Sequence, residues 1–214
     1  MRTYLGVSII FTCMLLLFTT SGNAEQKMHE LKNYYVVYDI SGNTTGTKKH
    51  ASHDYGRKQC WIEVSDTNIM GNSVKKNEKV ITTIENGDQW IITINLDDNT
   101  GTKMKNPMYQ GLAATMEGKN PKELSEQLMK QMGGKIIGEK TINNEKCTEW
   151  TLMGGAKTCV TEDLIAVESG ADMAGITIRE VATEVKRNDP GPKGICDIGN
   201  AKIKEIDLGQ IMGR

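Results

Sequence analysis

A helical stretch set among strands is the feature that most constrains this fold. Residues 104–134, MKNPMYQGLAATMEGKNPKELSEQLMKQMGG, are typical of helix, and the residues on both sides are typical of strand. The second half contains a start signal, because Asn120 can cap a helix, Pro121 suits its first position and Glu123 completes a capping box. A pair of glycines at the end of the stretch is a stop signal. The sequence therefore predicts a sheet that carries a helical insert.

The apolar residues of this insert recur at helical spacing. Leu124, Leu128 and Met132 lie four residues apart, so they share one face of a helix. The same spacing recurs more weakly in the first half of the insert, at Met108, Leu112 and Met116. Two short amphipathic helices in tandem are expected.

Methionine is unusually frequent in the insert. The methionines are Met104, Met108, Met116, Met129 and Met132. Unbranched thioethers suit a surface that adapts to a flexible apolar partner. Two interpretations stay open: the stripe covers the open face of a sheet as ordinary core, which is the commoner use of such a stripe, or it is a lid that faces a ligand.

The first residues of the chain have the pattern of a secretory signal peptide. Arg2 precedes an apolar run from Val7 to Phe18, and small residues end at Ala24. Cleavage is expected before Glu25, which leaves a single domain over residues 25–214. The sequence predicts an exported protein, located in the periplasm or secreted, with no membrane-spanning segment in the mature chain.

The charge of the chain excludes one class of partner. The net charge is −1 at pH 7, and loss of the signal peptide removes Arg2 but no acidic residue. The mature domain is therefore slightly acidic, without the basic surplus that nucleic-acid binding requires.

Strand patterns fill the rest of the chain. Clear patterns are found at residues 33–40, 45–53, 57–64, 78–85, 89–96, 135–142, 145–152, 157–161, 164–168, 175–187 and 201–206, with a weaker one at 68–76 that is either a strand edge or a loop. Asn86-Gly87 predicts a tight hairpin turn. In the strand that follows, Trp90, Ile92 and Ile94 alternate, so they share one face.

These patterns predict a mostly β fold of the α+β class. Consecutive strands with tight turns favour an antiparallel sheet, strongly curved into a half-open barrel, with the two helices covering its concave face. A change of phase between Ile178 and Val181 predicts a bulge in the long strand at 175–187.

Four cysteines remain after the signal peptide: Cys60, Cys147, Cys159 and Cys196. In an exported protein an even number favours disulfides, and four cysteines allow three pairings. Cys147 and Cys159 flank a Gly-Gly pair in an expected hairpin, so we predict that they are linked, with Cys60 joined to Cys196 by elimination. The alternative is that some of them are buried free thiols.

No residue pattern predicts catalysis. His50, His53 and Asp54 form a cluster with possible metal or proton-transfer chemistry, but residues three apart on a strand point to opposite faces. We interpret them as solvated polar residues. Nucleophile-elbow, phosphate-loop, metalloprotease, zinc and haem motifs are all absent from the sequence. A non-enzymatic protein without cofactor or metal is expected.

Two segments carry a family resemblance. Residues 80–107, VITTIENGDQWIITINLDDNTGTKMKNP, resemble the periplasmic lipoprotein-carrier superfamily of LolA and LolB, where strand, glycine turn, aromatic strand and helical insert follow one another. The tail, ITIREVATEVKRNDPGPKGICDIGNAKIKEI, is similar to the closing strands of a branch of secreted domains of unknown function. The resemblance implies a half-open barrel with a helical lid whose inner surface holds acyl chains or an apolar peptide.

Two functions from different classes follow. The first is a periplasmic binding protein that holds a lipid or other apolar ligand between sheet and lid. The residues predicted to contact this ligand are Trp90, Ile92, Met104, Met108, Leu112, Met116, Leu124, Leu128 and Met132. The second is a structural or protein-interaction domain of the cell envelope with a fully packed core.

Overall fold

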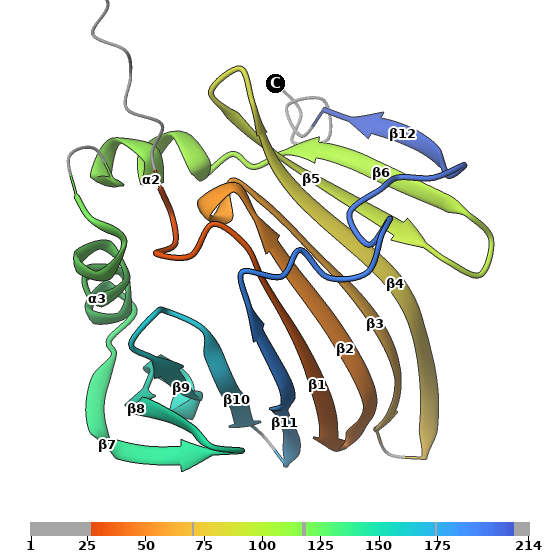
Figure 1. The fold of residues 1–214 in the computed structure, drawn as a ribbon. Coiled ribbons are helices and arrows are strands. Elements are labelled where there is room, and N and C mark those ends of the chain that lie inside the picture. The colour runs from red at the N-terminus through yellow and green to blue at the C-terminus, as the bar shows by residue number, and fades with distance from the viewer. Residues whose placement is uncertain (1–26, 70, 117–118, 174, 208–214) are drawn as a thin grey trace, which may run out of the picture.

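The residues that the structure describes form one long sheet with two short helices (Figure 1). The structure is a computed structural model that describes residues 27–69, 71–116, 119–173 and 175–207. The predicted signal peptide, residues 1–24, lies outside these ranges. The strands are β1 (Tyr34–Gly42), β2 (Thr44–His53), β3 (Lys58–Ile69), β4 (Asn72–Glu85), β5 (Asp88–Asn95), β6 (Thr100–Lys105), β7 (Lys135–Ile142), β8 (Glu145–Thr151), β9 (Lys157–Thr161), β10 (Ala166–Met173), β11 (Ile176–Arg187) and β12 (Lys202–Ile206). The helices are α2 (Tyr109–Met116) and α3 (Pro121–Gln131), with 3₁₀ turns at Asp54–Gly56 and Met153–Gly155.

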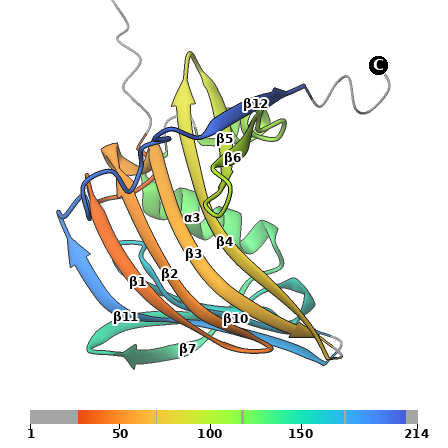
Figure 2. The same ribbon diagram turned by 90° about the vertical axis from the view of Figure 1, so that its right-hand side faces the viewer.

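The strands form a single open sheet. Their order is β12-β6-β5-β4-β3-β2-β1-β11-β10-β9-β8-β7, so β12 and β7 are its two edges. Figure 2 shows β1 to β4 side by side, with β7, β10 and β11 below them. The prediction of a mostly β fold of the α+β class is confirmed.

Short-range turn signals determine the hairpins. The predicted Asn86-Gly87 turn joins Glu85 to Asp88, and both turn residues have the positive φ of 54° and 80° that such a turn requires. Asn143 and Asn144 play the same role between β7 and β8, with φ values of 45° and 69°. Asparagine tolerates this region better than other non-glycine residues, which explains its use here.

The sheet departs from the prediction at its first edge. Residues Thr100–Lys105, which the sequence places partly in the helical insert, form β6 and pair with β5. Met104 therefore belongs to a strand and not to a helix. The last strand, β12, pairs with β6 in parallel and not antiparallel, because the chain crosses the sheet before it enters this edge.

The bulge in β11 lies further along than predicted. Val37 pairs with Glu184 and Tyr38 with Ala182, so Thr183 is the extra residue. Residues Ile176 to Val181 pair with β10 in unbroken register. The apparent change of phase near Ile178 is therefore a change in side-chain type only.

Apolar clusters lie on both faces of β1. Tyr34, Val36 and Tyr38 belong to a first cluster, whereas Tyr35 belongs to a second. Since alternate residues of a strand point to opposite faces, β1 is covered on both sides. This explains why the sequence of β1 is nearly continuously apolar instead of alternating.

The segment between β11 and β12 covers the second cluster. It crosses the sheet (Figures 1 and 2) and is bonded to β3 by a disulfide between Cys60 and Cys196. The Lys79 ammonium donates to the carbonyl oxygens of Gly194 and Asp197, at 3.2 and 3.0 Å. These contacts fix a stretch that has no regular structure of its own.

Helix α3 begins and ends where the sequence predicts. The Asn120 side chain accepts a hydrogen bond of 2.9 Å from the Glu123 backbone N–H, and Pro121 is the first helical residue. At the other end the N–H groups of Gly133 and Gly134 donate to the carbonyls of Lys130 and Met129. This pattern, with a positive φ of 73° at Gly133, is a Schellman motif.

Candidate functional site

A cavity of about 600 Å³ lies between α3 and the strands β7, β8 and β9. Its lining residues are Lys122, Ser125, Glu126, Met129, Ile136, Glu139, Lys140, Thr141, Lys146, Cys147, Thr148, Trp150, Val160, Thr161, Glu162 and Leu164. The volume is within the range of small-molecule sites, about 300–1,000 Å³.

One face of α3 forms the helical wall of this cavity. Lys122, Ser125, Glu126 and Met129 recur at spacings of three and four, so they lie on a common face. Leu124 is buried at 4% exposure and is not among the lining residues. The cavity therefore faces the mixed polar side of the helix and not its leucine stripe.

Trp150 provides the largest apolar surface on the sheet side. It lies on β8, is 7% exposed, and alternates with Thr148 and Lys146, which also line the cavity. Val160 of β9 is opposite Thr148 in the β8–β9 ladder. The aromatic ring and the aliphatic side chains together form an apolar wall with polar groups beside it.

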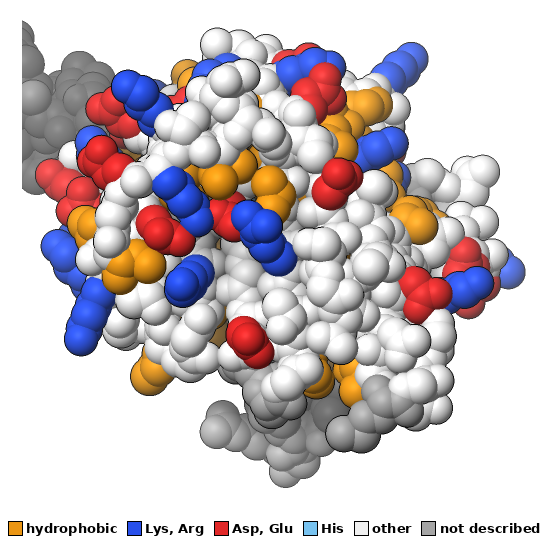
Figure 3. Space-filling model, turned by 90° about the horizontal axis from the view of Figure 1, so that it is seen from below, with side chains coloured by type: hydrophobic (Ala, Val, Ile, Leu, Met, Phe, Trp, Pro, Cys, Tyr) orange, Lys and Arg blue, Asp and Glu red, His pale blue; other side chains and the backbone are white. Residues whose placement is uncertain are grey.

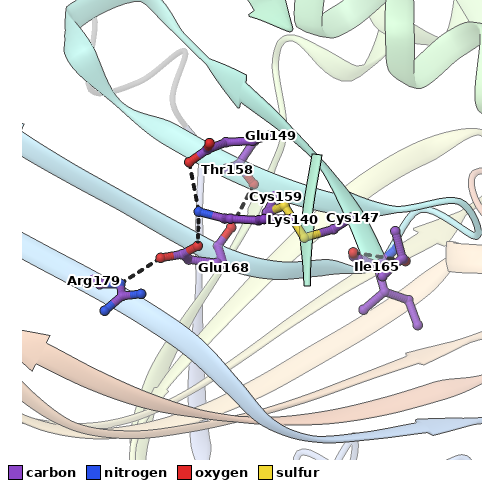
Figure 4. The surroundings of a disulfide bond; sticks show 9 residues. Lys140, Cys147, Glu149, Thr158, Cys159, Ile165, Glu168 and Arg179 are labelled. Atoms are coloured by element: carbon purple, nitrogen blue, oxygen red, sulfur yellow. Dashed lines mark hydrogen bonds and ion pairs between the residues drawn. A yellow bond between two sulfur atoms is a disulfide. The ribbon is translucent and has the colours of Figure 1, made fainter. Parts of the chain in front are cut away.

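A disulfide fixes this wall. Cys147 of β8 and Cys159 of β9 are bonded, with their Cα atoms 5.4 Å apart (Figure 4). Cys147 pairs with Thr161 and Cys159 with Glu149, so the bridge links diagonal positions of the ladder. This pairing, and that of Cys60 with Cys196, is the predicted one.

A network of ion pairs lies beside the disulfide. Figure 4 shows Lys140 between two carboxylates, Glu149 at 2.7 Å and Glu168 at 2.5 Å, with Arg179 on the other oxygen of Glu168. Burial alone would lower the pKa of Lys140, but the hydrogen bonds that its ammonium donates to Glu149 and Glu168 outweigh burial and raise that pKa. The positive charge of Lys140 is therefore balanced by carboxylates of the same chain.

The remaining charged groups of the lining lie toward solvent. Lys122 and Glu162 are 3.8 Å apart, with side chains 54% and 93% exposed. A neighbouring groove shares Lys122, Lys146, Thr161 and Glu162 with the cavity, and in this groove Arg187 is paired with Glu145 and Asp163 at 2.7 and 2.5 Å. The mouth of the cavity is therefore polar and balanced in charge.

A smaller cavity of about 340 Å³ lies on the other side of this ion network. It is lined by Lys140, Glu149, Gly155, Lys157, Thr158, Glu168, Gly170, Ala171, Asp172, Thr177, Ile178 and Arg179.

Figure 3 shows the molecule from below, where acidic, basic and hydrophobic side chains are interspersed. Such a mixed surface does not select one class of ligand.

The residues predicted from the strand pattern are dispersed. Ile92 is 3% exposed and belongs to the second apolar cluster. Trp90 is half-buried, with the ammonium groups of Lys103 and Lys105 over its ring at 4.2 and 5.2 Å. Met104, predicted as part of the helical insert, is half-buried on β6.

The residues predicted from the helical pattern are also separated. Leu124 is buried and Leu128 half-buried, whereas Met132 and Met108 are 47% and 79% exposed. The side chains of Leu112 and Met116 lie outside the described residues. Of the predicted residues whose side chains are described, none lines the cavity, and their contact with a ligand stays a prediction.

The cavity residues that sequence reasoning missed had weak signals. Met129 lies in the methionine-rich insert, and Trp150 is one of the three tryptophans. Ile136 is the second residue of the strand predicted at 135–142. Their convergence depends on how α3 lies over β8, which no local pattern specifies.

The histidine cluster separates as predicted, but the solvated interpretation is wrong for His50. His53 Nε2 is 2.9 Å from the carbonyl oxygen of Pro190 in the segment after β11. His50 Nε2 is buried and without a hydrogen-bond partner among the described residues, and its ring is edge-on to Tyr34 and Trp61. Burial, followed by the charge of Lys48, lowers the pKa of His50 to about 3.

The described ranges contain no group of three or more His, Cys, Asp or Glu side chains arranged to hold a metal ion. None of their helices has the length and apolarity needed to cross a membrane.

No protein-family model and no curated protein sequence matches this chain. Its fold is similar to that of an uncharacterized conserved protein from Thermus thermophilus, with a TM-score of 0.51, 8% identity, and coverage of 83% of this chain and 92% of that one. This likeness concerns the fold alone.

Weaker likenesses have TM-scores below 0.5. A β-barrel-like protein of the domain of unknown function DUF1849 from Brucella abortus has a TM-score of 0.49 and 8% identity, over 75% of this chain and all of that one. MucB, solved in complex with MucA from Pseudomonas aeruginosa, has a TM-score of 0.40 and 10% identity, over 75% of this chain and 53% of that one.

Proposed function

We propose that this chain is an exported, non-catalytic binding protein that holds a lipid or another apolar ligand in the cavity between α3 and β7–β9. The observation that carries this proposal is the cavity itself, about 600 Å³ and walled by Trp150. Sites for small ligands are typically concave, mainly apolar and equipped with a few polar groups.

The lining suits an amphiphile in particular. Met129, Trp150 and Val160 offer apolar contacts, and an unbranched thioether such as Met129 adapts to a flexible chain. Lys122 and Glu162 lie at the exposed mouth, where they meet a polar head group. A ligand with one apolar chain and a polar end would satisfy both regions.

We further propose that the sheet is a half-barrel whose hollow is covered by α3, and that residues 1–24 direct export. The two disulfides support an oxidising compartment. This is the arrangement that the resemblance to the lipoprotein carriers implies.

The test is native mass spectrometry of protein purified without detergent. The unaltered protein should carry co-purified lipid. Met129→Asp places a charge in the cavity and should abolish the adduct, whereas Met132→Asp, at a half-exposed position of the same segment that does not line the cavity, should retain it. Repeated spectra of ligand-free unaltered protein would contradict the proposal.

The alternative is a structural or protein-interaction domain of the cell envelope with a packed core. It is supported at β1 to β3, where Tyr34 is 3% exposed and the His50 and Trp61 rings pack nearby. Under this alternative Met129→Asp unfolds the protein, while under the binding proposal it leaves the melting temperature nearly unchanged.

A further inference from the structure

Residues 27–32, called the pre-β1 segment below, are held against the 3₁₀ turn between β2 and β3 (Figure 1). The backbone N–H groups of Met28 and His29 donate to the carbonyl oxygen of Tyr55, at 2.8 and 2.9 Å. The Tyr55 N–H in turn donates to the carbonyl oxygen of Lys32, at 3.0 Å. The segment forms neither helix nor strand, so these hydrogen bonds hold its backbone in place.

The backbone of the turn is shaped to receive this segment. Asp54, Tyr55 and Gly56 have φ values of 51°, 55° and 86°, a left-handed conformation that residues with a side chain rarely adopt. A Cβ atom at Gly56 would lie 2.6 Å from Cδ2 of His29 and 2.9 Å from Cβ of Met28, so the close approach requires glycine. Strained backbone of this kind persists where surrounding contacts maintain it, and it is frequent in switch regions.

His29 is the side chain by which the segment reaches the core. Its Nε2 lies 3.4 Å from the hydroxyl oxygen of Tyr34, and the two rings are edge-on with their centres 5.1 Å apart. Tyr34 belongs to the first apolar cluster, against which Leu31 of the segment also packs. Nδ1 of His29 is buried and has no hydrogen-bond partner among the described residues. A protonated ring would therefore bury a charge and a donor without an acceptor.

The ionisable groups around His29 do not balance such a charge. Asp163, in the turn between β9 and β10, is the carboxylate that acts on His29, and it already pairs with Arg187 at 2.5 Å. A charge on His29 and a charge on His50 of β2 disfavour each other. Burial outweighs the opposite effect of Asp163 and lowers the pKa of His29 to about 4.

The other charged groups lie on the segment itself and on the turn. They are Lys27, Glu30 and Lys32 on the segment and Asp54 and Arg57 on the turn. The Lys27 ammonium lies over the Tyr55 ring, 4.1 Å from its centre, and Glu30 lines the groove beside the cavity. Within the described ranges, none of them accepts a hydrogen bond from Nδ1 of His29.

We propose that the pre-β1 segment is a latch that acid releases: when His29 binds a proton, its ring leaves Tyr34 and the segment leaves Tyr55. In the released segment the ring is solvated and has the ordinary histidine pKa of about 6.5. The open form therefore binds the proton more readily than the closed form, whose pKa is lowered. Closure is complete above about pH 6.5, and the equilibrium shifts toward the open form by about thirtyfold between pH 7.5 and pH 5.

Release has two consequences for the surface. It uncovers the Tyr34 end of the first apolar cluster, and it removes the wall that Glu30 contributes to the groove. Since that groove shares Lys122 and Glu162 with the cavity, the mouth of the cavity widens. This consequence for a ligand rests on the proposed function, whereas the release itself does not.

Hydrogen exchange of the two amides bonded to Tyr55 tests the latch. After correction for the intrinsic exchange rate at each pH, protection of the Met28 and His29 N–H groups should fall about thirtyfold between pH 7.5 and pH 5. His29→Leu leaves no titrating ring on the segment and should remove this fall. His50→Leu is the matched control on β2 and should retain it.

A second pair of variants opens the latch without acid. Gly56→Ala places a Cβ against His29 and should leave the segment amides unprotected already at pH 7.5. Gly71→Ala is the control, because Gly71 also has a left-handed φ, 82°, but has no atom within 4 Å of the added Cβ. Circular dichroism checks that both variants are folded.

Four results would overturn the proposal. They are protection that does not change with pH, an equal fall in His29→Leu, equal effects of the two alanine variants, and equal protection of the segment and the β1–β2 ladder, which would mean exchange by global unfolding alone. Met129→Asp should leave the exchange of the segment unchanged, so failure of the cavity ligand and failure of the latch are distinguishable.

Discussion

Cys60, within β3, is bonded to Cys196 in the segment that crosses from β11 to β12. The bridge joins residues 136 positions apart and holds that segment over the second apolar cluster. The segment contains no strand and no α-helix, and the bridge is the main covalent link that holds it in place.

Replacing both Cys60 and Cys196 by serine should therefore be costly. A bridge across so long a loop removes about 5 kcal/mol of denatured-chain entropy in the simple loop-closure model. We expect the free energy of unfolding, measured with urea, to fall by about 3–5 kcal/mol. A smaller fall than that of the Cys147/Cys159 double variant would contradict the assignment.

Removal of the second bridge should cost less. Cys147 and Cys159 are only 12 positions apart, and a loop of this length corresponds to about 3 kcal/mol. Cys147→Ser with Cys159→Ser should lower the unfolding free energy by about 2–3 kcal/mol. Mass mapping of a non-reduced digest should link these two cysteines; a link from either one to Cys60 would refute the pairing.

The contribution of the N-terminal cap of α3 to stability can be tested by a single substitution. Asn120→Ala removes the acceptor of the Glu123 N–H and should lower the free energy of unfolding by about 1 kcal/mol. Asn120→Asp retains an acceptor and serves as the control. Equal losses for the two variants, measured by urea denaturation, would argue against the cap.

Buried histidines make stability depend on pH. Burial lowers the pKa of His29 to about 4, as it does that of His50 to about 3. In the unfolded chain a histidine has its ordinary pKa of about 6.5, so the unfolded state binds more protons at mildly acid pH. Stability is then full above about pH 6.5 and falls as the pH drops toward the folded values.

The part of this fall that comes from His50 can be isolated. Between about pH 7.5 and pH 5 the unaltered protein should lose about 2 kcal/mol of unfolding free energy through His50. His50→Leu removes the titrating group and should show a loss that is smaller by this amount. The same pH dependence in both proteins would contradict the buried, neutral state of His50.

Local signals account for the parts of the fold that the sequence predicts well. The bounds of β7 and β9 match the strand patterns, because turns and alternation at these sites are encoded within a few residues. The cap at Asn120 and the Asn86-Gly87 turn are equally local. In each case the residues that determine the structure are adjacent in sequence.

Long-range pairing accounts for the parts of the fold that the sequence did not predict. Strand β6, TGTKMK, has little alternation and exists because β5 and β12 pair with it on both sides. The cavity likewise depends on the placement of α3. Its lining uses Lys122 and Glu126, on a face that amphipathic reasoning assigns to solvent, and not the Leu124 stripe.

Quenching of Trp150 fluorescence tests the central claim most directly. The chain has three tryptophans, so Trp61→Phe with Trp90→Phe leaves Trp150, which lines the cavity, as the only tryptophan. Titration with a brominated fatty acid should quench this tryptophan to saturation, with a stoichiometry of one ligand per chain, and Met129→Asp should prevent it. Absent or unsaturable quenching, or equal quenching in the Met129→Asp variant, would contradict a ligand between α3 and the sheet.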